Sequence, residues 1–188
     1  MRNALIAGFL GLAIAGGSTC VFAQQIDLNA LAKRPDFQVT RKDGDDVVEI
    51  RKASVVITKG RDGLMAIDSD TAVLCVWTIY VGLHVAADYC FPDSERDLKE
   101  DFAGAIERFK DFIVANSLTP VTRSDLDAYV EKRRAELISH ALKTPIGAPR
   151  CPKLDFFADY QADGREKRRA DVAKMLAVPR PPVMNPCL

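Results

Sequence analysis

The chain has 188 residues, of which 48% are hydrophobic, and its 26 Lys and Arg residues balance its 26 Asp and Glu residues. A chain of this length forms one domain with enough residues to bury a real core. The zero formal net charge predicts no nucleic-acid partner and no attraction to an acidic membrane surface, because both need a surplus of positive charge.

The first 23 residues have the pattern of a secretory signal peptide. Arg2 makes a positive start, residues 4–16 are apolar, and residues 21–23 form a site typical of cleavage after Ala23. A membrane anchor is the alternative, but the apolar run is shorter than the ~20 residues of a spanning helix. Lipidation of Cys20 is a third reading, which the residues before Cys20 do not favour. We therefore predict a periplasmic or secreted protein without a transmembrane anchor after cleavage.

The next segment, residues 24–46, is mixed and polar, which predicts an extended or loosely packed N-terminal arm. Its Asp43, Asp45 and Asp46 are interpreted as a solvated loop, with calcium binding as the alternative although the EF-hand spacing is missing. The β-branched runs within residues 47–68 flank a glycine-containing turn at residues 60–63, and they predict a small β-hairpin. A helix over residues 47–58 is the alternative, because neither Gly nor Pro interrupts it.

A helix is predicted over residues 71–89, capped by Ser69 or Asp70. It is apolar on nearly every face, as in a helix at the centre of a bundle or in a membrane. The flanking cysteines and Asp88 favour the centre of a bundle. Gly82 is interpreted either as a close-packing point against a neighbouring helix or as a break in the helix.

Three further helices are predicted. Residues 94–116 have the strongest helical periodicity and begin with a capping box of Ser94 and Asp97. Ser124 is expected to cap a third helix that reaches about residue 141, and a fourth spans residues 164–177. The proline-rich tail, residues 179–188, excludes regular helix. The sequence thus predicts a mainly α fold over residues 47–188, with three to four helices, a small N-terminal β-hairpin and disulfide staples.

Cleavage of the signal peptide removes Cys20 and leaves four cysteines, which in an exported chain predict two disulfides. Cys75 and Cys90 are fifteen residues apart on one helix, or about 22 Å, which is too far for a bond unless the helix breaks at Gly82. Short links favour antiparallel neighbours, so the third helix should return to the Cys90 end. This topology favours Cys90–Cys151 and leaves Cys75 for Cys187 in the tail, so that the disulfides tie the tail to the domain.

No catalytic, cofactor or metal motif is visible. The chain has neither C-x-x-C nor C-x-x-C-H, His84 lies in an apolar stretch, and the adjacent Ser139 and His140 do not face each other on a helix. We predict no catalytic residue, no metal site and no cofactor. The candidate binding residues are on the exposed side of the last helix, and they are Arg165, Lys167, Arg168 and Arg169. This basic face is either simply solvated or a contact for an acidic partner.

The predicted core helix and the residues just after it contain cysteines, small residues and a proline in a fixed order, namely Cys75, Gly82, Ala86, Cys90 and Pro92. An amphipathic helix and one further helix follow this segment. Over residues 75–141 the order resembles the small exported helical immunity proteins that protect bacteria against type VI secretion amidases. The hairpin region has no counterpart in that pattern. The resemblance implies that the chain neutralises a periplasmic toxin by binding it.

Two classes of function follow. The first is an exported non-enzymatic protein that binds another protein or an envelope component, in the manner of an immunity protein or an inhibitor. Its candidate surfaces are the N-terminal arm, the hairpin edge and the basic face of the last helix. The second is a small envelope hydrolase, whose carboxylates the fold would bring together without any local motif.

Overall fold

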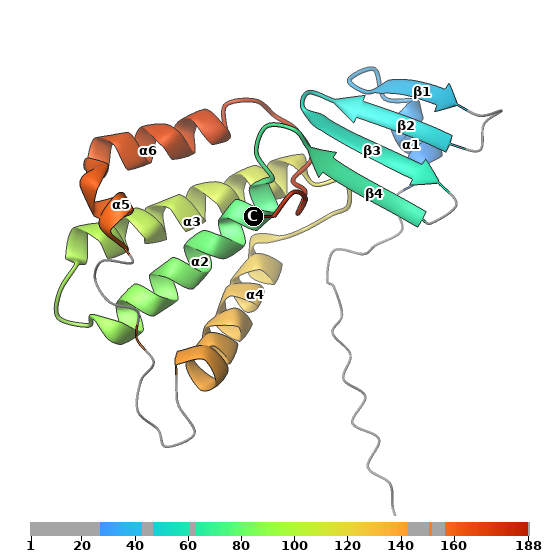
Figure 1. Cartoon of the computed structure of the whole chain (residues 1–188). Helices are drawn as coiled ribbons and strands as arrows, with labels where there is room; N and C mark the ends of the chain where they lie inside the picture. The colour runs from blue at the N-terminus through green and yellow to red at the C-terminus, as the bar shows by residue number, and fades with distance from the viewer. Residues whose placement is uncertain (1–26, 43–46, 61–62, 143–150, 152–156, 188) are drawn as a thin grey trace, which may run out of the picture.

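The computed structural model describes residues 27–42, 47–60, 63–142, 151 and 157–187. The predicted signal peptide, the Asp43–Asp46 cluster and the tip of the predicted hairpin lie outside these residues. A four-stranded sheet with one short helix sits at one end of a group of packed helices (Figure 1). The fold is mainly helical, as predicted, but its β part is larger than a hairpin.

The sheet is an antiparallel meander in the order β1-β2-β3-β4. Its strands are β1 (Gln38–Lys42), β2 (Val47–Lys52), β3 (Val55–Gly60) and β4 (Gly63–Asp68). The register places Ile50 opposite Ile57 and Ile57 opposite Ala66, so one face of the sheet is apolar across three strands. The helical alternative for residues 47–58 is therefore wrong, because that segment forms β2 and β3.

The N-terminal arm is not loose. It contributes the short helix α1 (Leu28–Ala32) and the edge strand β1, and Asp27 caps α1 by accepting hydrogen bonds from two backbone N–H groups. Leu28, Leu31 and Phe37 are buried against the apolar face of the sheet, where they form a second hydrophobic core. These few apolar residues among polar ones carry too weak a periodicity to be recognised in the sequence.

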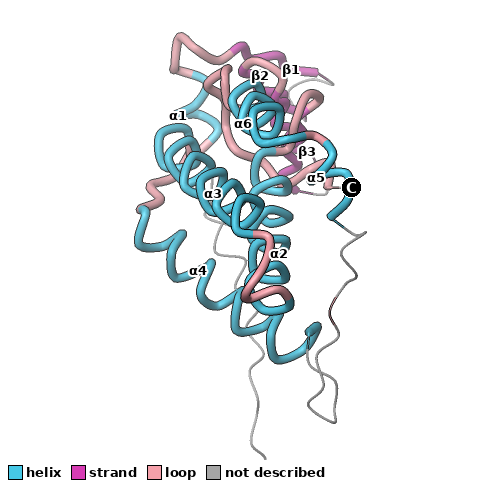
Figure 2. The backbone as a smooth tube through the Cα atoms, turned by 90° about the vertical axis from the view of Figure 1, so that its left-hand side faces the viewer, coloured by secondary structure: helices cyan, strands magenta, loops and turns pink. Residues whose placement is uncertain are grey.

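The main core is built around α2 (Val73–Cys90), which packs closely against α3 (Arg96–Asn116) (Figure 2). By length and composition, α2 is the one helix in the described part of the chain that could cross a membrane; here it is the central core helix. It continues through Gly82, and a Cβ atom there would meet nothing within 4 Å. Gly82 is therefore neither a break nor a close-packing point, which corrects both readings.

All three predicted helix caps are wrong. The N-cap of α2 is Ala72, without a side-chain hydrogen bond, so neither Ser69 nor Asp70 caps that helix. At the start of α3, Glu95 adopts a left-handed conformation (φ 57°) and no side chain caps the helix, so the Ser94–Asp97 capping box does not form. The helix α4 (Arg123–Glu136) is capped by Thr122 rather than Ser124. Thr122 and Asp125 form a reciprocal capping box there, which satisfies two backbone N–H groups at once.

Further helical segments complete the fold. A π-helical segment, η2 (Leu137–Leu142), extends α4, while the short α5 (Ala158–Ala162) precedes α6 (Gly164–Met175). In Figure 1, α6 lies along α3 on the side away from α4. The predicted third and fourth helices thus correspond to α4 with η2 and to α6, and the sequence analysis missed α5.

The structure pairs Cys75 with Cys187 and Cys90 with Cys151, with Cα–Cα distances of 5.3 and 5.5 Å. Both pairings are those that the antiparallel topology favoured, and they fasten the two ends of α2 to distant parts of the chain. Two disulfides are consistent with an oxidising location outside the cytoplasm.

The C-terminal tail joins the helices to the sheet. The Leu74 N–H donates to the Val183 carbonyl (3.0 Å), and the Asp68 N–H donates to the Asn185 carbonyl (2.9 Å), so the tail pairs with the end of β4. Figure 1 shows the C-terminus beside the start of α2. Part of the predicted open edge of the hairpin is therefore occupied by the chain itself.

A buried ion pair lies where the tail, the sheet and the helices meet. The Arg180 side chain is 1% exposed, and its Nε donates to Asp68 Oδ2 (2.6 Å). Its Nη1 donates to the carbonyls of Met175 and Val178, and its Nη2 to the carbonyl of Thr71. Arg180 thereby links β4, the start of α2 and the end of α6 through one side chain.

Candidate functional site: a basic pocket between α3 and α6

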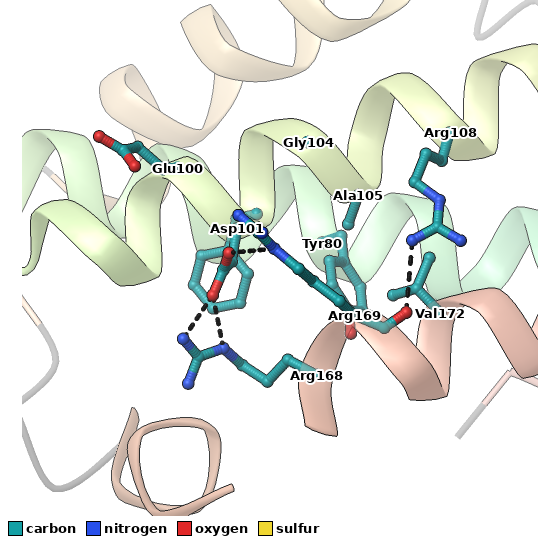
Figure 3. A pocket seen from close by; sticks show the side chains of 10 residues that line it. Tyr80, Glu100, Asp101, Gly104, Ala105, Arg108, Arg168, Arg169 and Val172 are labelled. Carbon is teal, nitrogen blue, oxygen red and sulfur yellow. Dashed lines mark hydrogen bonds and ion pairs between the residues drawn. The ribbon is translucent and has the colours of Figure 1, made fainter. Parts of the chain in front are cut away.

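The helix α6 directs three arginines towards one carboxylate on α3. Arg165, Arg168 and Arg169 lie at helical spacings of three and four, so they share a face, and all three donate to Asp101. The Nε atoms of all three lie 3.1 Å from a carboxylate oxygen of Asp101, whose side chain is 3% exposed. Figure 3 shows Arg168 and Arg169 converging on this carboxylate.

This arrangement corrects the prediction of one exposed basic face. Arg168 is buried, with 9% of its side chain exposed, because it lies between Asp101 and the Tyr160 carbonyl and donates to both. Lys167 pairs instead with Asp163 (2.8 Å), the residue before α6, and with Asp171 (3.1 Å) on α6. Only part of the predicted set therefore remains open to a partner.

The arginines stabilise the charged form of Asp101. Burial raises the pKa of Asp101, but hydrogen bonds from Arg168, Arg165 and Arg169 outweigh that effect and hold the pKa below its usual 3.8. Arg165 also donates to Glu100 (2.7 Å). The carboxylate is therefore ionised at neutral pH and fixes the position of the guanidinium groups.

A pocket of about 260 Å³ opens beside this cluster. Its lining combines three arginines and two carboxylates with an apolar wall, and it consists of Tyr80, Glu100, Asp101, Phe102, Gly104, Ala105, Arg108, Arg168, Arg169 and Val172. Burial raises the pKa of Tyr80 to about 12, so its hydroxyl is neutral at physiological pH. The arginines Arg108, Arg168 and Arg169 form the basic rim of the pocket. Its uncharged wall consists of Tyr80, Phe102, Ala105 and Val172.

Arg108 and Arg169 differ from Arg168, which is buried. The Arg169 side chain is 58% exposed, and its Nε–H is the donor bonded to Asp101. Arg108 lies on α3, one turn beyond Gly104, and its Nη1 donates to the Arg169 carbonyl at 3.3 Å (Figure 3). Within the described part of the chain, no other partner is found for either guanidinium. Most of their N–H groups therefore remain available to a ligand in the pocket.

Asp101, Tyr80 and the role of Arg108 were not predicted from the sequence. The sequence contains one indication of this site. Asp101, Ala105 and Arg108 are spaced at i, i+4 and i+7, so they lie on one face of the helix. Nothing local, however, shows that α6 covers this face.

His84 is not part of the pocket. It lies on α2, its Nε2 is 3.6 Å from Asp88, and burial lowers its pKa. The side chain of His140 lies outside the described residues. No group of three or more His, Cys, Asp or Glu side chains suitable for a metal ion is found among the residues that the structure describes.

The fold and the site together define a disulfide-linked protein that combines a small sheet with a helical core and has a basic pocket on the helical side. Comparison with protein-family models, with curated proteins and with solved structures finds no match. The function must therefore be argued from the site itself.

Proposed function

We propose that this protein is an exported, non-enzymatic binding protein that captures another envelope or secreted protein at the pocket between α3 and α6. The observation that carries the proposal is the spare hydrogen-bonding capacity of Arg108 and Arg169 beside an apolar wall. Interfaces favour this combination of arginine donors and apolar surface. The partner is expected to present an acidic group, which the arginine rim complements.

An immunity- or inhibitor-like role is the form of binding that we favour. The resemblance of residues 75–141 to exported immunity proteins supports it, because those proteins act by occupying a toxin rather than by catalysis. The compartment suits such a role as well, since two disulfides are consistent with an oxidising environment.

The alternative, an envelope hydrolase, needs a carboxyl group that acts as a general acid, and such groups have a raised pKa. In the described part of the chain, every carboxyl group with a shifted pKa has it lowered; these are Asp36, Asp68, Asp101 and Asp125. Arginine or lysine partners cause the first three shifts, and Thr122 causes the fourth. Each of these four carboxyl groups is thus stabilised in its ionised form, which is the opposite of what a general acid requires.

Site-specific photo-crosslinking in the envelope tests the proposal. A photo-reactive residue at Ala173 is expected to crosslink a partner protein, because this position is exposed and lies one helical turn beyond Arg169 on α6, outside the pocket lining. Arg169→Gln should remove the crosslink, whereas Arg133→Gln, a matched loss of charge on α4, should leave it. An equal loss of the crosslink in Arg133→Gln and in Arg169→Gln would contradict the proposed surface. Hydrolysis of peptidoglycan by the purified protein, abolished by one carboxylate substitution that preserves the fold, would instead establish the enzyme.

A further inference from the structure

We infer that the pocket between α3 and α6 takes the C-terminal carboxylate of a peptide chain whose last side chain is apolar. This inference rests on the proposed function and specifies what the partner presents. It follows from three properties of the pocket: its unsaturated donors, its apolar wall and its open side at Gly104.

The donors select a carboxylate. Asp101 holds Arg169 through Nε, which leaves the two Nη groups of that guanidinium for a ligand. Arg108 is held through Nη1 against the Arg169 carbonyl, which leaves its Nε and Nη2. Guanidinium groups bind carboxylates with short, charge-assisted and often bidentate hydrogen bonds. Because both side chains already have one fixed contact, little of their remaining freedom is lost when a ligand binds.

The charge around the pocket favours an anion. Three arginines and two carboxylates line the pocket, and Arg165, which bonds to both carboxylates, adds a further positive charge beside it. An anionic ligand reduces this surplus. The apolar wall, which phosphate has no apolar group to contact, favours a carboxylate next to an apolar side chain over phosphate.

The wall selects an apolar neighbour of that carboxylate. Tyr80, Ala105 and Val172 are buried residues that line the pocket, and Phe102 adds a second aromatic ring. A C-terminal residue carries its carboxylate and its side chain on the same Cα atom, so both reach one small pocket together. An Asp or Glu side chain offers the charge without the apolar group. The volume of about 260 Å³ is below the usual range of pockets for larger ligands, roughly 300–1,000 Å³, and suits one terminal residue.

The entrance lies at Gly104. This residue is exposed on α3, and a Cβ atom added there would meet nothing within 4 Å. The absence of a side chain leaves room for the backbone of an incoming chain between Asp101 and Arg108 (Figure 3). The same open space permits a larger side chain at this position without a clash inside the protein.

Calorimetric titration of the mature, disulfide-bonded protein tests the inference. The probes are N-acetyl-alanyl-leucine with a free carboxylate, the same dipeptide as its C-terminal amide, and inorganic phosphate. The free acid is expected to bind at least about tenfold more tightly than the amide, because a charged hydrogen-bond acceptor is lost in the amide. Phosphate is expected to bind more weakly than the free acid.

Substitutions in the pocket test which residues bind the free acid. Arg169→Gln and Arg108→Gln should each weaken binding of the free acid about tenfold, by the same loss of charged hydrogen bonds. Arg133→Gln, the matched control, should not change it. Gly104→Leu should abolish binding by filling the entrance, whereas Gly104→Ala should preserve it. Circular dichroism and thermal melting confirm that each variant is folded.

Equal affinity for acid and amide, tighter binding of phosphate, or binding that survives both arginine substitutions would each overturn the inference. Absence of binding by the free acid would overturn it too. If the crosslinked partner still depends on Arg169 in that case, the proposed protein-binding function stands and only the terminal-carboxylate ligand is wrong. If the crosslink is also independent of Arg169, both fail.

Discussion

Asp68 and Asp101 are both buried carboxylates held by arginine, yet their surroundings differ in one respect. At Asp68, a single buried guanidinium makes four hydrogen bonds within the protein, because Arg180 also donates to three backbone carbonyls. At Asp101, three guanidinium groups share one carboxylate, and one of them, Arg169, remains largely exposed. The first site is closed and the second is open.

The difference indicates what each site does. A buried pair whose donors are bonded within the protein and shielded from solvent holds parts of a fold together and offers no open surface to a ligand. The Asp68–Arg180 pair joins the sheet, the tail and two helices, so its role is structural. The Asp101 cluster has more donors than the carboxylate can use, and the excess faces a pocket. Such an excess is what a binding site for an acidic group requires.

The largest effect is expected at the closed site. Arg180→Met should lower the free energy of unfolding by about 3–5 kcal/mol, because it leaves Asp68 charged, buried and without its partner. Chemical denaturation measures the loss. The double variant Asp68→Leu with Arg180→Met should recover part of it, since no buried charge is then left unpaired. A loss below about 1 kcal/mol for Arg180→Met would show that the junction does not depend on this pair.

A smaller effect is expected at the open site. Asp101→Asn should lower the free energy of unfolding by about 1.5–3 kcal/mol, the usual range for a hydrogen bond to a charged group. The cost is smaller than at Asp68 because Arg165 keeps its bond to Glu100 and Arg169 remains in water. A loss as large as that of Arg180→Met would mean that both sites are structural in the same sense.

The stability of Asp101→Asn should depend less on pH than that of the unmodified protein under acidic conditions. The pKa of Asp101 is held below 3.8 in the folded protein, so its ion pairs stabilise the fold at higher pH. That contribution is complete above the unfolded pKa and disappears as the pH falls below about 4 through the folded pKa. Asp68 behaves in the same direction. Asp101→Asn should therefore reduce, without removing, the loss of stability between pH 5 and pH 2, measured by denaturation at a series of pH values.

Local pattern and topology predicted much of this fold, and long-range contacts account for most of what was missed. The helical periodicity of residues 71–116 and the end-to-end separation of Cys75 and Cys90 were sufficient to predict the core helices and to favour both disulfides. In contrast, Asp101 and Arg168 are 67 residues apart in the chain, and no local signal pairs them. The strand β1 was missed because its burial depends on the sheet that it joins.

The smallest stability effect is expected for Arg169→Gln. Its side chain is 58% exposed, against 9% for Arg168, so water replaces most of what the substitution removes. We expect a change within about 0.5 kcal/mol for Arg169→Gln, as for ordinary surface substitutions, and a clear loss for Arg168→Met, which leaves part of a buried carboxylate unsatisfied.

Denaturation of the two variants side by side checks this contrast between neighbours on one helix. If Arg169→Gln destabilises the protein as much as Arg168→Met, the three arginines act as one structural unit, and the Asp101 site is closed like the Asp68 site. If only Arg168 matters for stability, Arg169 does not serve the fold. Its free donors beside the apolar wall of the pocket then point to an acidic ligand rather than to the fold.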